Sequence, residues 1–319
     1  MAESNRWISA SDGARLFMRC WEAEGTPRGL VHIVHGMAEH SRRYGELARR
    51  LNAAGFEVWA ADMRGHGQTA DDGVNEIDQG GLLGHCADQD GFSRVLADID
   101  EINRLIGESR PGVPLFLLGH SWGSFIAQGY IETYRYPLAG CILSGTRGPG
   151  GFKAAAGGRV MAFLAFLLGC RRRSRLAWML ADKPFNKPFR PNRTNFDWLS
   201  RDEGAVDAYR ADPLCGKLVT VGFYRDLTGA LCRIHQIKAM EEINRDLPIY
   251  VFSGSADPVG DMGNGPTALV NVYRSMGIKD LEFVLYPDAR HEVLNETNRE
   301  EVTENLLSWL SRHVPVEGR

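Results

Sequence analysis

The chain of 319 residues is predicted to fold as an α/β protein built on a doubly wound, mostly parallel sheet. Short apolar runs recur along it, and stretches with helical periodicity separate them. Continuous apolar runs are typical of strands that are buried on both faces of a parallel sheet, and their alternation with helices favours a doubly wound arrangement. The composition, 44% hydrophobic and 24% charged, is that of a globular protein with a sizeable core and excludes a disordered chain.

The residue pattern places the strands and helices of this fold. Residues 7–20 are expected to form a hairpin, because an Asp12-Gly13 turn joins two extended runs. Six further strands are expected at the apolar runs 30–34, 57–61, 115–118, 141–143, 249–252 and 281–285. Helices are predicted at 44–54 and at 92–106, where apolar residues recur at three- and four-residue intervals.

Residues 148–240 break this alternation. They are helix-like, rich in arginine and aromatic residues, and interrupted by prolines at 184, 188, 191 and 213. Residues 151–240 carry 16 Lys+Arg and 7 Asp+Glu, a net charge of +9, so the rest of the chain carries 37 − 16 = 21 and 40 − 7 = 33, a net charge of −12. We therefore expect a core formed by residues 1–147 and 241–319, and an insertion, 148–240, that lies over the sheet.

The sequence also argues against a nucleic-acid partner, a metal site and a membrane-spanning segment. The net charge of −3 lacks the basic footprint of a nucleic-acid-binding protein. The six cysteines show neither a CxxC pair nor a Cys/His ligand spacing, so we expect free thiols in a reducing compartment and no metal site. The N-terminus has no apolar signal-peptide region, and the longest apolar run, 160–170, is shorter than the about 20 residues that cross a bilayer. The expected location is the cytoplasm, with contact to a membrane at its surface at most.

The strongest local signal is the pentapeptide Gly119-His120-Ser121-Trp122-Gly123. It follows a predicted strand and precedes a helix-like run, which is the context of a nucleophile elbow. In such a turn the glycines allow a sharp reversal that lifts the Ser121 hydroxyl above the sheet and points the next helix N-terminus at it. A serine at this position also argues against the hydrolases that use an aspartate nucleophile.

Ser121 needs a base, because a serine hydroxyl is a weak nucleophile near neutral pH, and histidine has a pKa in the right range. His291 is the candidate because it follows the last predicted strand, at the edge where open α/β sheets place their sites. Asp257, just past the preceding strand, is the candidate for the carboxylate that orients the imidazole. The order Ser, Asp, His suits this architecture. Asp261 and Asp288 are the alternative carboxylates.

A tetrahedral intermediate needs two backbone N–H donors. Trp122, the residue after the nucleophile, is expected to supply one of them. Met37 is expected to supply the other, because it lies in the loop that follows predicted strand 30–34, where Gly36 allows a tight turn.

Together, these residues resemble the α/β-hydrolase superfamily, and most of all its monoacylglycerol lipase and lysophospholipase branch, which is grouped with the serine aminopeptidase-like (S33) hydrolases. Five blocks carry the resemblance: HGMAEHSRRY (35–44), ADMRGHGQT (61–69), GHSWG (119–123), SGSADPV (253–259) and YPDARHEVLNE (286–296). They span nearly all of the chain outside the insertion. The resemblance implies an α/β-hydrolase fold in which 148–240 forms a helical lid after the sixth strand.

The resemblance also implies roles for residues around the site. It assigns Met37 and Trp122 to the oxyanion hole, and it maps the Glu and Arg that hold the glycerol headgroup in monoacylglycerol lipases to Glu39 and Arg43. Mammalian members carry a second histidine three residues beyond the catalytic one, where this chain has Leu294. No metal or organic cofactor is implied, because serine acyl transfer needs none.

The expected activity is hydrolysis of carboxylic esters of lipid type, monoacylglycerols or lysophospholipids, through an acyl-enzyme. The apolar run 160–170 lies beside Arg171, Arg172, Arg173 and Arg175. Two interpretations of it stay open: a lid helix that docks on lipid, with arginines meeting anionic headgroups, or a core-packed lid helix beside a solvated arginine cluster.

Three other activities are alternatives to a lipid ester hydrolase. One is a broad carboxylesterase of short-chain esters. Another is a serine aminopeptidase, which the positive insertion disfavours because a terminal ammonium needs acidic partners. The third is a ligand-binding relative without catalysis, which the intact Ser-Asp-His set disfavours.

Overall fold

The computed structural model describes residues 2–71 and 73–315. At its centre lies an eight-stranded sheet in the order β1-β2-β4-β3-β5-β6-β7-β8. The strands are β1 (Ala2–Ser9), β2 (Arg15–Glu22), β3 (Gly29–Val34), β4 (Phe56–Ala61), β5 (Leu115–His120), β6 (Gly140–Ser144), β7 (Ile249–Gly254) and β8 (Leu281–Tyr286). The pairs β1–β2 and β2–β4 are antiparallel, and all other neighbours are parallel. The predicted hairpin, the six predicted strands and the mostly parallel sheet are confirmed.

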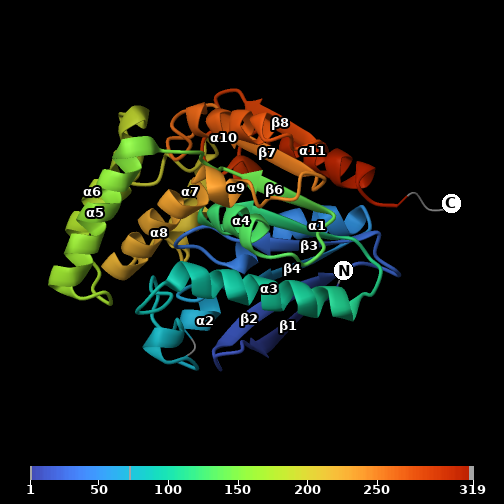
Figure 1. Cartoon of the computed structure of the whole chain (residues 1–319), viewed down its shortest axis with the longest axis horizontal. Coiled ribbons are helices and arrows are strands. Elements are labelled where there is room, and N and C mark those ends of the chain that lie inside the picture. The colour runs from blue at the N-terminus through green and yellow to red at the C-terminus, as the bar shows by residue number, and fades with distance from the viewer. Residues whose placement is uncertain (1, 72, 316–319) are drawn as a thin grey trace.

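Helices cover both faces of this sheet (Figure 1). Side chains of α1 (Gly45–Ala53) and α11 (Arg299–Arg312) pack on one face. Those of α3 (Gly91–Ser109), α4 (Trp122–Thr133) and α10 (Asn264–Ser275) pack on the other. The central strands are buried on both sides, which explains their unbroken apolar sequence. The predicted helices 44–54 and 92–106 correspond to α1 and α3.

Short helical turns complete the core. They are η1 (Ser41–Tyr44), α2 (Gly67–Asp71), η2 (Ile77–Gln79) and η4 (Val293–Asn295).

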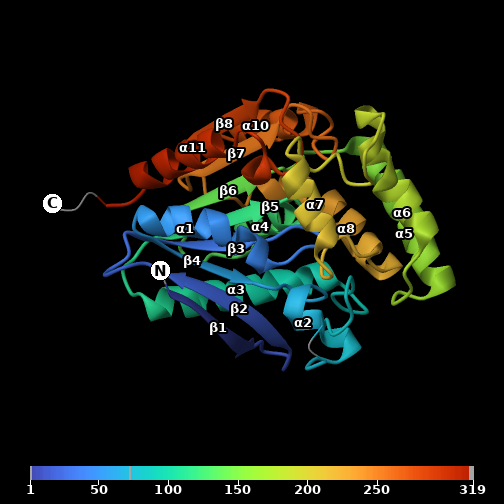
Figure 2. The same ribbon diagram turned by 180° about the vertical axis from the view of Figure 1, so that it is seen from behind.

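The chain between β6 and β7 is helical and lies beside the sheet's carboxyl edge. It contains α5 (Gly151–Leu168), α6 (Arg175–Ala181), η3 (Lys183–Phe189), α7 (Glu203–Ala211), α8 (Val221–Ile234) and α9 (Ile237–Met240). Helix α5 packs mainly on α8. In Figures 1 and 2, α5 and α6 form the outer edge of the molecule, beyond α7 and α8. Among the described residues, no helix combines the length and apolar character needed to cross a membrane.

Parallel pairing brings four loops to one place. The carboxyl ends of parallel strands meet at the same edge of a sheet, so the segments after β3, β5, β7 and β8 come together there. These four segments carry Met37, Ser121, Asp257 and His291. The topology therefore assembles one site from residues that are distant in the sequence.

Candidate active site

Ser121 occupies a sharp turn between β5 and α4. Its backbone has φ 53° and ψ −121°, a conformation that is costly for any residue except glycine. A Cβ atom at Gly119 would lie 2.2 Å from the carbonyl oxygen of Gly123, and one at Gly123 would lie 2.0 Å from that of Val34. Only glycine fits at these two positions, and this close approach of strand and helix is what holds Ser121 in its strained turn.

Ser121, His291 and Asp257 form a continuous series of hydrogen bonds. The Oγ atom of Ser121 lies 2.7 Å from Nε2 of His291. The Nδ1 atom of the same ring lies 2.9 and 3.0 Å from the two carboxylate oxygens of Asp257. Asp261 and Asp288, the alternative carboxylates, form no hydrogen bond with the imidazole.

Asp257 is held from its own turn after β7. Its Oδ1 atom accepts the backbone N–H of Val259 at 2.9 Å, and its Oδ2 atom accepts the Ser253 hydroxyl at 3.2 Å. The carboxylate is fully buried. Because its position is fixed, the Nδ1 atom of His291 is kept as a donor and Nε2 is left to face the Ser121 hydroxyl.

The pKa of His291 is set by opposing effects. Burial lowers the pKa, but the charge and hydrogen bond of Asp257, with smaller contributions from Glu292 and Glu39, outweigh it and raise the pKa above its ordinary value of 6.5. The imidazole is therefore a stronger base than a histidine in water, as proton abstraction from serine requires.

Two unpaired N–H groups lie beside Ser121, one in the loop after β3 and one at the start of α4. Within the described part of the chain, the backbone N–H groups of Met37 and Trp122 donate to no protein acceptor. Glu39 shapes this loop, because its Oε1 atom accepts the Gly36 N–H at 2.5 Å and the Tyr44 hydroxyl at 2.9 Å. The arrangement leaves two donors available to an anionic oxygen.

Arg43 joins this loop to the segment that carries His291. Its guanidinium donates to both oxygens of Glu292, at 2.8 and 2.7 Å, and also to Oε2 of Glu39. Burial raises the pKa of Glu39, but Arg43, nearby histidines and the Gly36 N–H outweigh it and lower that pKa to about 2. Glu39 therefore stays ionised. Glu292 was not singled out from the sequence, although its position directly after His291 was a signal.

His120 lies close to the site without a hydrogen bond to Ser121. Its Nδ1 atom is 3.3 Å from the Ser144 hydroxyl, and its ring packs against that of His291 at 5.0 Å between centroids. Burial, reinforced by the charge of His291, lowers the pKa of His120 to about 4. It is therefore neutral at physiological pH.

A narrow cavity of about 50 Å³ opens onto Ser121 and His291. The core contributes Met37, Glu39 and Glu292 to its walls, while the insertion contributes large side chains that no motif marks. The insertion residues that line it include Trp178, Asp182, Phe196, Trp198, Tyr209 and Lys217. Arg43 does not line this cavity.

The insertion also forms hydrogen bonds with the segment that carries His291 and packs against it. The backbone N–H of His291 points at the Trp198 carbonyl at 3.4 Å, and that of Glu292 donates to the Leu199 carbonyl at 2.7 Å. The Trp198 ring lies 5.0 Å from the imidazole. Sequence reasoning missed Trp198 because it lies in an irregular segment without periodicity.

The chain is similar to known proteins over nearly its whole length. Residues 25–298 match the family model described as serine aminopeptidase, S33. A monoacylglycerol lipase of Mycolicibacterium smegmatis is 30% identical over 305 residues, covering 95% of each chain. The monoglyceride lipase of Mus musculus is 32% identical, covering 97% of this chain and 90% of its own. The solved structure of a thermostable carboxyl esterase from Bacillus coagulans, in complex with glycerol, has a TM-score of 0.89 at 29% identity and covers 99% of this chain and 100% of its own. As its motifs predicted, the chain belongs to the serine aminopeptidase S33 family, has the α/β-hydrolase fold and is a serine hydrolase.

Proposed function

We propose that this serine hydrolase cleaves esters with a single long acyl chain, monoacylglycerols first and lysophospholipids second. The observation that carries the proposal is the hydrogen-bonded series Ser121–His291–Asp257 beneath an insertion with an exposed apolar surface. The similarity to a bacterial monoacylglycerol lipase and to the mouse monoglyceride lipase supports the same class of substrate.

In the proposed mechanism, Ser121 Oγ attacks the ester carbonyl while His291 Nε2 takes its proton. The imidazolium that forms is stabilised by Asp257, and the oxyanion accepts the N–H groups of Met37 and Trp122. His291 then returns the proton to the leaving alcohol, which leaves Ser121 acylated. Water, activated by the same imidazole, attacks the acyl-enzyme and releases the fatty acid.

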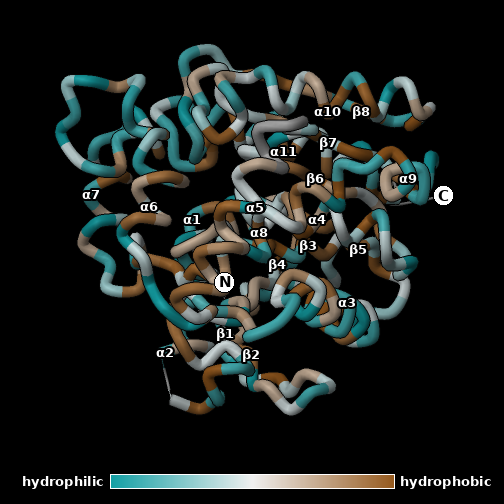
Figure 3. Tube along the Cα trace, turned by 60° about the vertical axis from the view of Figure 1, so that its left-hand side comes forward, coloured by the Kyte–Doolittle hydropathy of each residue, from teal (hydrophilic) through white to brown (hydrophobic). Residues whose placement is uncertain are grey.

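The apolar surface of the insertion supports a lipid substrate. Eight of the twelve exposed large hydrophobic residues of the described chain lie between residues 160 and 180, and Phe166 is 84% exposed. Figure 3 turns helix α5 towards the viewer, coloured mostly from white to brown. The exposed Arg171 and Arg172 lie between α5 and α6, and the exposed Arg175 is the first residue of α6. Such a surface suits docking of α5 and α6 on a lipid layer with anionic headgroups.

The insertion then acts as a lid, because the cavity over Ser121 is too small for the proposed substrate. A volume of about 50 Å³ holds one or two water molecules, whereas ligand sites usually measure roughly 300–1,000 Å³. Trp178 and Tyr209, both from the insertion, line the cavity. We infer that these walls move apart to admit an acyl chain when the enzyme meets lipid.

Glu39 and Arg43 divide the proposed headgroup role between them. Glu39 lines the cavity, and its ionised carboxylate is suited to accept a hydrogen bond that a glycerol hydroxyl donates. The guanidinium N–H groups of Arg43 donate to Glu39 and Glu292 instead. We therefore assign hydroxyl binding to Glu39 and positioning of that carboxylate to Arg43.

The proposed location is the cytoplasm, with peripheral contact to membranes through the lid. All six cysteines lie among the described residues and are free thiols, most of them buried. Free buried thiols suit a reducing compartment.

A panel of substrates tests the proposal. We expect turnover to be fastest with a long-chain monoacylglycerol, slower with a lysophospholipid, and slowest with a short-chain ester and an aminoacyl amide. Ser121→Ala should abolish both the turnover of all these substrates and the acylation burst, and its circular dichroism spectrum should be unchanged. Retained turnover in that variant would contradict the mechanism, and a preference for short or cationic substrates would contradict the lipid assignment.

A carboxylesterase of short-chain esters is the second candidate. The narrow cavity and the similarity to the Bacillus coagulans esterase favour it. An aminopeptidase finds less support in the cavity walls. Arg43 pairs with both Glu39 and Glu292, and burial raises the pKa of Asp182 to about 7. None of the three carboxylates that line the cavity, Glu39, Asp182 and Glu292, therefore offers a full negative charge without a cationic partner to a substrate ammonium.

A further inference from the structure

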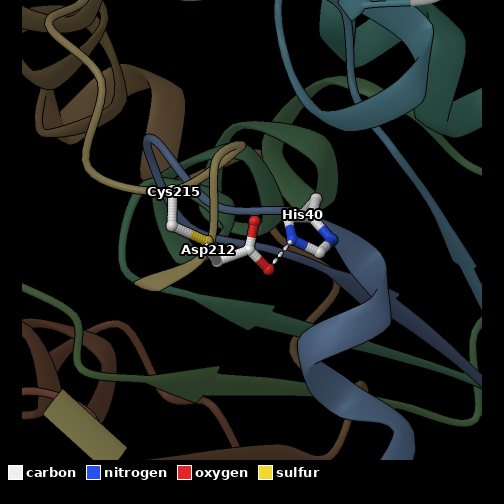
Figure 4. Close-up of side chains that lie close together, drawn as sticks. All are labelled: His40, Asp212 and Cys215. Atoms are coloured by element: carbon white, nitrogen blue, oxygen red, sulfur yellow. Dashed lines mark hydrogen bonds and ion pairs between the residues drawn. The ribbon is translucent and has the colours of Figure 1, made fainter. Parts of the chain in front are cut away.

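His40, Asp212 and Cys215 lie together where the insertion meets the core (Figure 4). One potential ligand atom of each residue lies within 4.8 Å of the other two. His40 Nε2 and Asp212 Oδ2 are 3.0 Å apart. Cys215 and Asp212 follow α7, whereas His40 follows the loop that carries Met37.

We propose that His40, Asp212 and Cys215 form a binding site for a thiophilic divalent cation such as Zn²⁺. Imidazole nitrogen, carboxylate oxygen and thiolate sulfur are the three donors that Zn²⁺ prefers in proteins. Zinc–ligand bonds of about 2.0–2.3 Å in a tetrahedron separate the donor atoms by roughly 3.3–3.8 Å. A side-chain shift of about 1 Å brings this cluster into that range, and the fourth position is left to water.

The Asp212 carboxylate is oriented towards His40 and is open to solvent. The Oδ1 atom of Asp212 accepts the Leu214 N–H at 2.8 Å, which turns Oδ2 towards His40. The Asp212 side chain is 30% exposed, so an ion reaches it from solvent. Coordination of the Cys215 thiol releases its proton to solvent and leaves a thiolate bound to the metal.

A second cluster of the same composition is a poorer site. His85, Asp88 and Cys170 also offer three donors. There, however, the Arg171 guanidinium donates to both oxygens of Asp88. A cation would have to displace this guanidinium or sit beside its positive charge, which disfavours binding. Arg43 lies near Asp212 and Cys215, but its guanidinium pairs with Glu39 and Glu292, and in the described chain no arginine forms an ion pair with Asp212.

The site joins two walls of the cavity over the nucleophile. The Gly216 N–H donates to the Ala38 carbonyl at 2.9 Å, and the Tyr209 hydroxyl donates to the same oxygen at 3.0 Å. Ala38, Tyr209 and Gly216 all line the cavity. A cation held by His40 from the core and Cys215 from the insertion would fasten these walls together and hinder their separation.

Spectroscopy of the full chain with Co²⁺ in place of Zn²⁺ tests the site. The wild type is expected to show tetrahedral Co²⁺ bands together with a thiolate-to-cobalt charge-transfer band. Cys215→Ser and His40→Gln should lose the charge-transfer band and the tetrahedral pattern, respectively. Cys170→Ser is the matched control from the poorer cluster and should keep both. Retention of the band in Cys215→Ser, its loss in Cys170→Ser, or its absence from the wild type would each overturn the proposal.

Thermal unfolding provides a second readout and a check on folding. Zn²⁺ should raise the Tm of the wild type and of Cys170→Ser by about 2–5 °C, because it binds the folded state. It should not raise the Tm of Cys215→Ser or His40→Gln. Cooperative unfolding of each variant in EDTA establishes that it folds, and either variant alone is enough for the comparison. An equal shift in all four proteins would place the ion elsewhere.

Fastening of the walls has a kinetic consequence, which rests on the proposed function. Zn²⁺ is expected to slow hydrolysis of a long-chain monoacylglycerol by the wild type about tenfold, by favouring the closed state, and to leave Cys215→Ser unaffected. Equal inhibition of Cys215→Ser would assign the effect to another site, such as His291, and would refute the wall-fastening role. The cobalt spectrum needs no substrate, so failure of the site and failure of the proposed function are distinguishable.

Discussion

Arg43 forms a bidentate ion pair with Glu292, which lies 249 residues away in the sequence, with N–O distances of 2.8 and 2.7 Å. The same guanidinium also pairs with Glu39. Glu292 is the neighbour of His291, and Glu39 accepts the Gly36 N–H beside Met37. One half-buried cation therefore couples the position of His291, the proposed base, to the shape of the loop that carries Met37, a proposed oxyanion donor.

Replacement of Arg43 should damage both stability and activity. Arg43→Met leaves two buried carboxylates without their cation, and we expect the free energy of unfolding to fall by about 3–5 kcal/mol. Urea unfolding measures this loss. Arg43→Lys keeps the charge but not the bidentate geometry, so the free energy of unfolding should fall by an intermediate amount. A change below about 1 kcal/mol for Arg43→Met, the range of a surface pair, would show that the network is not needed for stability.

Asp257→Asn should lower kcat by roughly 10⁴-fold, because an amide no longer fixes the imidazole tautomer or stabilises its charged form. Ester hydrolysis under saturating substrate measures this effect. Asp261→Asn and Asp288→Asn are matched controls in neighbouring turns, and each should keep nearly the full kcat. A comparable loss in either control would move the third member of the site to that residue.

The pH dependence follows from the raised pKa of His291. Only the neutral imidazole accepts the Ser121 proton, so kcat/KM should rise with pH and level off above a midpoint that exceeds 6.5. In Asp257→Asn, burial acts without the carboxylate, so the midpoint of the residual activity should move to lower pH. Initial rates with a water-soluble ester across the neutral range give both midpoints. A wild-type midpoint below 6.5 would contradict the direction of this shift.

Much of the fold and the central part of the site could be predicted from the sequence because their signals are local. Strands buried on both faces appear as unbroken apolar runs, and the turn at Ser121 requires glycines at fixed offsets. The contact of Trp198 with His291 and the Arg43–Glu292 pair leave no such signal. They join segments that are distant in the chain, and neither periodicity nor motif spacing reports which of those segments meet.

The cluster of His40, Asp212 and Cys215 illustrates the same limit. His40 and Asp212 are separated by 172 residues, so no short Cys/His ligand spacing marks this cluster in the sequence. The spacing of the cysteines predicted free thiols, and all six, which lie among the described residues, are free. Only the packing of the insertion against the core brings one of those thiols beside an imidazole and a carboxylate.

Gly123→Ala should destabilise the turn that holds the nucleophile. The added methyl would lie 2.0 Å from the Val34 carbonyl oxygen, a backbone atom that has no room to yield. We expect a lower Tm and a loss of turnover beyond what the drop in folded protein explains. Gly229→Ala in α8 is the matched control, since its new methyl meets nothing within 4 Å. That variant should gain about 0.5–1 kcal/mol in free energy of unfolding, and a similar loss in both variants would contradict the steric argument.

The exposed apolar surface of α5 and α6 should decide how strongly the enzyme binds lipid. Phe166→Ser and Leu167→Ser remove two of its most exposed side chains, and we expect the double variant to sediment less with vesicles that contain anionic lipid. Each buried side chain of this size contributes roughly 1.5–3 kcal/mol to the transfer from water, so the affinity should fall by at least tenfold.

Ile237→Ser provides the matched control for this surface. Ile237 is 66% exposed but lies in α9, outside the segment 160–180. Its substitution should leave vesicle binding unchanged, and hydrolysis of a water-soluble ester should be the same in all three proteins because none of these side chains lines the cavity. If the double variant binds vesicles as strongly as the wild type, α5 and α6 do not dock on lipid, and their apolar face must serve another contact.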